Sequence, residues 1–84
     1  MTTPNDLSDK ALAVFAFAAY HQLESGDAIT SVIARDGAGH RADPDAIAEL
    51  QARELGELNG ERFVFSIAGQ MTLSQIIDRI KGHI

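Results

Sequence analysis

DPDAIAELQARELGELNGERFVFSI, residues Asp43–Ile67, is the stretch of the sequence that decides the predicted fold. It opens with helix-start signals, because the Asp43 carboxylate can accept free amide hydrogens of the first turn and Pro44 suits the first helical position. Gly56 is expected to end this helix, since glycine enters the left-handed conformation without steric penalty. Between these signals, apolar side chains recur at helical spacing and predict a buried stripe: Ala46, Ile47, Ala48, Leu50 and Leu55.

A β-hairpin is expected directly after this helix. Asn59-Gly60 favours the pair of positive backbone torsions that a two-residue hairpin turn requires. That turn would place Glu57 opposite Arg62. Beyond the turn, apolar residues alternate with others in the period-two pattern of a strand with one buried face: Phe63, Phe65 and Ile67.

Length and composition indicate one small folded domain. The 84 residues leave room for a single core, and residues 1–6, polar with a proline, are expected to form a loose tail. An apolar fraction of 45% with 23% charged residues is ordinary for a folded protein. The chain has no cysteine, which excludes disulfides, zinc–thiolate sites, iron–sulfur clusters and a thiol nucleophile.

The charge and the apolar runs indicate a soluble chain, and the absence of cysteine suits a cytoplasmic location. The net charge is −5, and an acidic surface disfavours binding to nucleic acid or to an anionic membrane, which depends on phosphate neutralisation. The longest apolar run, Ala11–Tyr20, is about half of what a membrane span needs. No basic stretch precedes it, as one would in a signal peptide. We expect no membrane association and no processing.

The first helix is expected to run from a Ser8 cap to about Glu24 and to stop at Gly26. A projection at 100° per residue gives it one apolar face, made of Leu12, Phe15, Ala16, Ala19 and Leu23. A second face lies nearly opposite: Val14, Phe17, Ala18 and His21. Either this is the central helix of the domain or the second face meets another chain. The hypothesis for the second case is a homodimer through those four residues.

The remaining segments complete a mostly helical α+β prediction. Ala28–Arg35 is interpreted as a short helix, with a strand as the rival reading because the run is rich in β-branched residues. Residues 36–42 are expected to form a flexible connection, and residues 68–71 a turn. Thr72 and Gln75 form a capping box for a last helix that Gly82 ends. The predicted fold is three helices, a two-stranded hairpin and a C-terminal helix.

This order of elements resembles the winged helix-turn-helix domain of bacterial transcription regulators. The likeness is carried by residues 43–69, in which Glu-Leu-Gly-Glu-Leu (54–58) leads to Asn-Gly-Glu-Arg-Phe-Val-Phe-Ser-Ile-Ala-Gly (59–69). In that family the third helix enters the DNA major groove and the hairpin wing reaches the backbone. Any DNA binding would have to rest on five positively charged residues, of which two lie within residues 43–69 and three precede them: Arg53 and Arg62, and Arg35, His40 and Arg41.

The charge of the would-be recognition helix favours a different use of the same fold. Its solvent face offers Asp45 and Glu49 beside Arg53, so its net field repels phosphate. Winged-helix domains without DNA contacts serve for protein–protein contact. The leading hypothesis is therefore a protein interaction module, with a homodimer as one form, and a DNA-binding regulator is the alternative.

No pattern in the sequence indicates catalysis, a metal or a cofactor. Residues 37–42 match the spacing of a dinucleotide-binding glycine motif, but the helix start at Asp43 lies beyond it, so the motif is interpreted as a turn. His21, His40 and His83 share no metal-ligand spacing. The carboxylates fall on helix starts and solvent faces, and no serine has a positioned base. The chain is expected not to be an enzyme.

Overall fold

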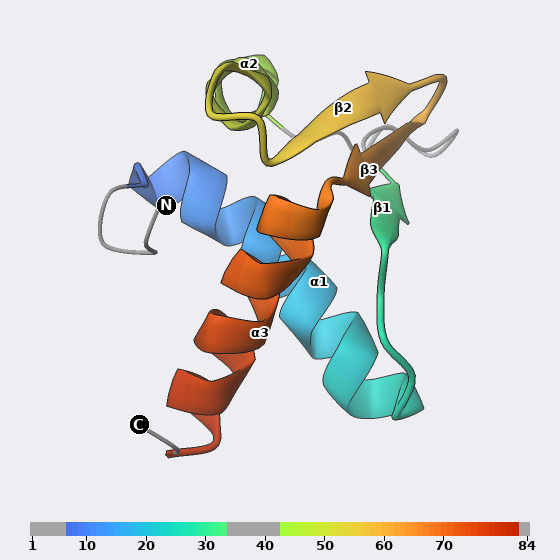
Figure 1. The fold of residues 1–84 in the computed structure, drawn as a ribbon, viewed down its shortest axis with the longest axis vertical. Helices are drawn as coiled ribbons and strands as arrows, with labels where there is room; N and C mark the ends of the chain where they lie inside the picture. Colours follow the sequence, from blue (N-terminus) through green and yellow to red (C-terminus); the bar gives the residue numbers. More distant parts are fainter. Residues whose placement is uncertain (1–6, 34–42, 83–84) are drawn as a thin grey trace.

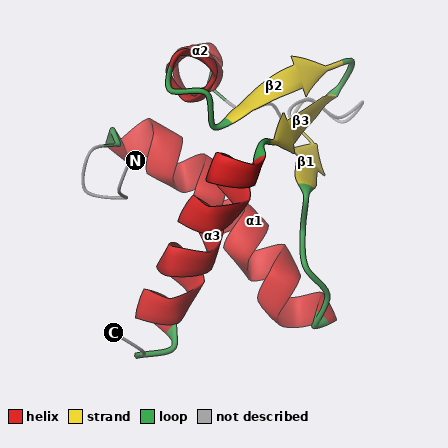
Figure 2. Ribbon diagram, viewed as in Figure 1, coloured by secondary structure: helices red, strands yellow, loops and turns green. Residues whose placement is uncertain are grey.

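The computed structural model describes residues 7–33 and 43–82, which form three helices and a three-stranded sheet. In chain order the elements are α1 (Asp9–Ser25), β1 (Ser31–Ile33), α2 (Pro44–Ala52), β2 (Gly56–Asn59), β3 (Arg62–Phe65) and α3 (Ile67–Ile80). The sheet is antiparallel with the order β1-β3-β2. Helix α1 packs against α2, α3 and β1, while α2 lies against β2. Figures 1 and 2 show α1 and α3 crossing beside the sheet and diverging toward their C-terminal ends.

The third strand corrects the predicted fold class. Within the segment interpreted as a short helix, Ser31–Ile33 is strand β1, so the sheet has three strands rather than the two of an isolated hairpin. Val32 is buried opposite Phe63, and the Phe65 amide donates to the Thr30 carbonyl at 2.9 Å. The β-branched side chains of this run suit a pleated surface, and a pairing with a distant strand decides in favour of β structure.

The helix α2 begins as predicted and ends earlier. Asp43 caps it, its Oδ1 accepting from the Asp45 amide at 2.8 Å, but the last helical residue is Ala52. The left-handed conformation belongs to Glu54, with φ 60°, and not to Gly56. Gly56 is instead the first residue of β2, where a Cβ atom would lie 2.5 Å from the Val64 carbonyl oxygen. Glycine is required there by the close approach of two strands.

The hairpin turn is shifted by one residue from the predicted frame. Asn59 pairs with Arg62, so the two loop residues are Gly60 and Glu61. Of these only Gly60 has a positive φ, 64°, as in a type II′ turn with glycine in its first central position. Glu57 consequently lies opposite Val64, and the predicted Glu57–Arg62 pair does not form.

Helix α3 starts five residues before the predicted capping box. Ser66 is its N-cap, with Oγ accepting from the Gly69 amide at 3.1 Å. Thr72 lies inside the helix, buried, and its hydroxyl donates to the Ala68 carbonyl at 3.0 Å. Ile67, expected on the buried face of the strand, opens the helix and is 72% exposed. The predicted stop at Gly82, with φ 83°, follows directly on the last turn.

The core lies where α1, α3 and the central strand meet. Phe15 of α1 stacks on Phe65 of β3, with ring centroids 5.2 Å apart, and Phe63 meets Phe65 edge to face at 5.6 Å. The caps predicted for α1 are confirmed, Ser8 at its start and Gly26, with φ 80°, at its end. These local signals fix the length of α1, and the aromatic cluster fixes which side of it faces inward.

Candidate interaction surface

Helix α1 has one fully buried side. Its members are buried in the hydrophobic core: Ala11, Val14, Phe15, Ala18 and Ala19. Two of the four residues expected on a second, partner-binding face, Val14 and Ala18, therefore belong to the core and are not accessible to another chain. Phe17 and His21, the other two, are exposed.

Between Ala13 and Leu23 the opposite side of α1 is also apolar, and it is exposed. We call it the outer face of α1, and it consists of Ala13, Ala16, Phe17, Tyr20 and Leu23. Phe17 is 49% exposed, Tyr20 61% and Leu23 42%. Single exposed apolar side chains are ordinary, whereas five on one face of one helix form a contiguous patch of the kind that marks contact sites. The projection from sequence had assigned Ala16 and Leu23 to the buried side.

The aromatic side chains of the outer face are ordered by one another. The His21 ring meets Phe17 edge to face at 4.5 Å and Tyr20 at 5.5 Å. A hydrogen bond from the Tyr20 hydroxyl to the Glu24 carboxylate raises the pKa of the tyrosine above its ordinary value of 10.0. The rings of Phe17, His21 and Tyr20 therefore contact one another on the surface of α1.

The N-terminal end of α1 is clasped to α2 by charged groups. The Ser8 amide donates to Glu49 Oε2 at 3.0 Å and the Ser8 hydroxyl to Oε1 at 2.6 Å. These two bonds, with the Arg53 charge, lower the pKa of Glu49 below its ordinary value. The Asp45 amide, and then the Lys10 ammonium at 3.2 Å, lower the pKa of Asp43. These contacts, which we call the clasp, hold the N-terminal end of α1 against α2.

The arginines proposed for DNA binding are engaged within the chain. Arg53 Nε lies 3.8 Å from Glu49 Oε2, one turn back on α2. Arg62 Nε donates to the Ser31 hydroxyl at 3.0 Å and its Nη2 to the Ser31 carbonyl at 3.5 Å, which ties β3 to β1. The other three residues of that set, together with the glycine motif at 37–42, lie outside the described residues: Arg35, His40 and Arg41.

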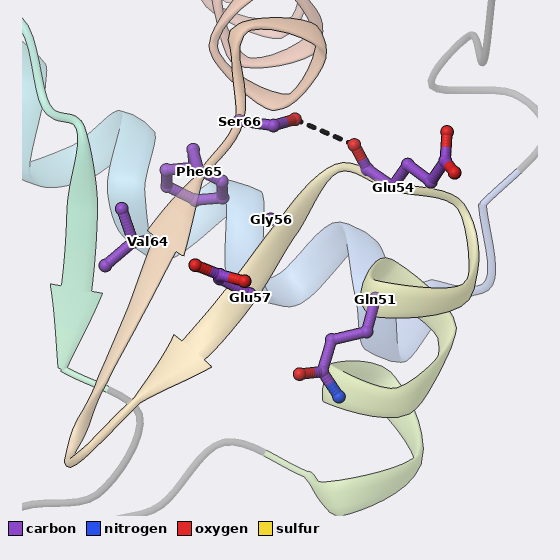
Figure 3. A pocket seen from close by; sticks show the side chains of 7 residues that line it. All are labelled: Gln51, Glu54, Gly56, Glu57, Val64, Phe65 and Ser66. Atoms are coloured by element: carbon purple, nitrogen blue, oxygen red, sulfur yellow. Dashed lines mark hydrogen bonds between the residues drawn. The ribbon is translucent and has the colours of Figure 1, made fainter.

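A hollow of about 490 Å³ lies between α2 and the hairpin (Figure 3). Two of its polar side chains, Gln51 and Ser66, hold neighbouring elements together. Gln51 Oε1 accepts from the Leu58 amide at 3.2 Å, and the Ser66 hydroxyl donates to the Glu54 carbonyl at 2.8 Å. Figure 3 shows the carboxylates of Glu54 and Glu57 pointing in different directions, so they do not converge on one ligand. The hollow therefore marks the boundary between α2 and the hairpin.

Within residues 7–33 and 43–82 no other feature points to ligand chemistry. No group of three histidine, aspartate or glutamate side chains is placed to hold a metal ion. Every buried side-chain nitrogen or oxygen in these segments has a hydrogen-bond partner. None of the described helices combines the length and apolar character needed to cross a bilayer. No known protein family matches the chain, and neither a curated protein nor a solved structure shows detectable similarity to it.

The outer face does have a signal in the sequence, but a projection at 100° per residue does not separate it from the other apolar stripes of α1. Ala13, Ala16, Tyr20 and Leu23 follow one another at spacings of three, four and three residues, the a/d pattern of a helix seam. The seam is hidden because the residues between its members are apolar as well. Only the structure shows which of the apolar stripes is left uncovered.

Proposed function

We propose that this protein is a small protein-interaction module that binds its partner through the outer face of α1. The observation that supports the proposal is the exposure of Phe17, Tyr20 and Leu23 side by side on a helix whose other side is already filled by the core. The partner would lie along the helix axis. A cytoplasmic location belongs to the same proposal and suits a chain without cysteine.

The energetics of the outer face fit binding better than solvation. Complete burial of a large apolar side chain contributes about 1.5–3 kcal/mol. Phe17, Tyr20 and Leu23 are each about half exposed, so each has on the order of 1 kcal/mol left to gain. Aromatic residues supply much of the binding energy of protein interfaces, and Tyr20 adds a hydroxyl at the rim.

Site-specific photo-crosslinking tests the proposal. A photoreactive phenylalanine analogue replaces Tyr20 in one variant and Met71 in another, Met71 being 45% exposed on α3 and outside the outer face. We expect a discrete protein adduct from position 20 that disappears when Phe17→Glu is added, and no such adduct from position 71. The same diffuse adducts from both positions would contradict an interaction site on α1.

A DNA-binding regulator is the second candidate function, as the winged helix-turn-helix resemblance implies. The observation that favours it is the β2–β3 hairpin following α2 directly, as a wing follows a recognition helix. Glu49 beside Arg53 on α2 weakens it, because the pair is nearly neutral toward phosphate.

An amide-resolved NMR titration with a mixed-sequence duplex at low salt tests this second candidate. It requires localised shifts around Arg53 and Arg62 that fade as salt is raised and that Arg53→Ala and Arg62→Ala weaken. The interaction module requires no shifts on α2 or the hairpin. The two functions therefore make opposite predictions for one spectrum.

A further inference from the structure

We propose that the partner of the outer face of α1 is the same face of a second copy of this chain, packed antiparallel about a two-fold axis near Phe17. This inference rests on the proposed function and specifies the partner. Its support is the distribution of side-chain size and of charge along α1, which complements itself when the helix is reversed. Such an interface is isologous, with the same residues contributed by both copies.

Side-chain size changes from one half of the outer face to the other. The N-terminal half carries the small residues Ala13 and Ala16, and the C-terminal half carries Tyr20 and Leu23. In an antiparallel pair centred on Phe17, Tyr20 of each copy lies over the alanines of the other, a knob against a hole. A parallel pair would set tyrosine against tyrosine and leave the alanines facing each other across a gap. The pattern fits the antiparallel arrangement alone.

Charge is distributed in the same complementary way along one rim of the outer face. Lys10, Phe17 and Glu24 are spaced seven residues apart, so Lys10 and Glu24 lie about 10 Å on either side of Phe17. Reversal about Phe17 places Lys10 of each copy beside Glu24 of the other. The Lys10 side chain is 63% exposed even while it pairs with Asp43, which leaves it accessible at the rim. Rim pairs of this kind add little affinity but fix orientation.

The size of the face sets the expected affinity. One helix face of about three turns is a small interface, below the roughly 800 Å² per partner of a standard complex. We therefore expect a dissociation constant in the micromolar to submillimolar range, and a wild-type protein whose sedimentation coefficient rises with concentration. Tyr20→Glu should abolish this rise, and Met71→Glu on α3 should leave it unchanged.

Engineered cysteines test the antiparallel geometry, and the absence of native cysteine makes the result unambiguous. Lys10→Cys and Glu24→Cys are made separately and oxidised alone and as a mixture. We expect a disulfide-linked dimer from the mixture and only background from either variant alone, whereas Phe17→Cys should crosslink with itself. Met71→Cys is the control and should form no dimer. Lys10, Phe17 and Glu24 are all exposed, so these variants leave the core intact, and Lys10→Cys removes only the exposed ion pair with Asp43.

Each outcome decides between stated alternatives. Self-crosslinking of Lys10→Cys and of Glu24→Cys would overturn the antiparallel arrangement. Failure of the wild type to associate at millimolar concentration, with no crosslink from the mixture, would overturn the homodimer. In that case a discrete adduct with another protein from position 20 would preserve the interaction module, and no adduct at all would remove both proposals.

Discussion

The ring of Phe15 in α1 stacks on the ring of Phe65 in β3, with 5.2 Å between centroids and 17° between planes. Both side chains are buried, and they come from segments 50 positions apart in the chain. The stack joins the longest helix to the central strand of the sheet, which is itself paired on both edges. Nearly every element of the described structure is thus linked to this one contact.

Phe15→Ala is therefore expected to destabilise the fold by about 3–5 kcal/mol, the usual cost of deleting a buried phenylalanine side chain. Phe17→Ala, two residues away on the outer face, is the matched control and should change the free energy of unfolding by about 1 kcal/mol or less. Urea denaturation at low protein concentration measures both values. Equal losses would mean that both sides of α1 belong to the core.

The parts of the fold that the sequence predicts correctly are set by local interactions. Ser8 and Asp43 each cap a helix because their side chains reach amides two or three residues away, and Gly26 ends α1 because of its own torsion. The alternation of Phe63 and Phe65 likewise reports one strand with one buried face. These features need no knowledge of the rest of the chain.

The errors come from choices that distant contacts make. Strand β1 is three residues long, and only its pairing with β3 decides against a helix. The capping-box pattern of Thr72 and Gln75 predicts the wrong start for the last helix, whose cap is Ser66. Ser66 prevails because its amide donates to the Leu55 carbonyl at 3.0 Å and its hydroxyl to that of Glu54. The outer face of α1 could not be assigned because Ala11–Tyr20 contains no polar residue to mark the solvent side.

Gly69→Ala tests the contact that selects the start of α3. A Cβ atom at this position would collide with the carbonyl oxygen of Leu55, a backbone atom that already accepts a hydrogen bond from Ser66. We expect a loss of stability of about 2 kcal/mol or more, as for overpacking in a core, despite the better helix propensity of alanine. Ser74→Ala, exposed on the same helix, should be neutral or slightly stabilising. Thermal unfolding of the two variants gives the comparison. An unchanged melting temperature for Gly69→Ala would mean that the Leu55 carbonyl does not lie against Gly69.

The frame of the hairpin turn can also be tested by mutation. Gly60 has φ 64°, so Gly60→Ala should cost about 1 kcal/mol, while Asn59, which lies in β2 with a negative φ, should tolerate threonine without loss. A turn centred on Asn59 and Gly60 would instead make Asn59→Thr costly, because a β-branched residue resists a positive φ. Chemical denaturation of both variants distinguishes the two frames.

The clasp between α1 and α2 predicts how stability depends on pH. Hydrogen bonds from Ser8 lower the pKa of Glu49 below its ordinary value of 4.5 in the folded state. The ionised carboxylate therefore stabilises the fold above about pH 4.5, and this contribution is lost as the pH falls through the lower folded pKa. Asp43, whose pKa is lowered from 3.8 by the Asp45 amide and by Lys10, acts in the same direction at more acidic pH.

Glu49→Gln should consequently flatten the acid limb of the stability profile, because the amide has one acceptor oxygen where the carboxylate has two, so one of the two Ser8 bonds is lost, and because the amide does not titrate. Urea denaturation from about pH 3 to about pH 7 measures the profile. Glu57→Gln removes a carboxylate exposed on β2 and should keep the slope of the wild type. If both variants flatten the limb equally, general charge repulsion governs acid unfolding, and the clasp makes no specific contribution to the packing of α1 on α2.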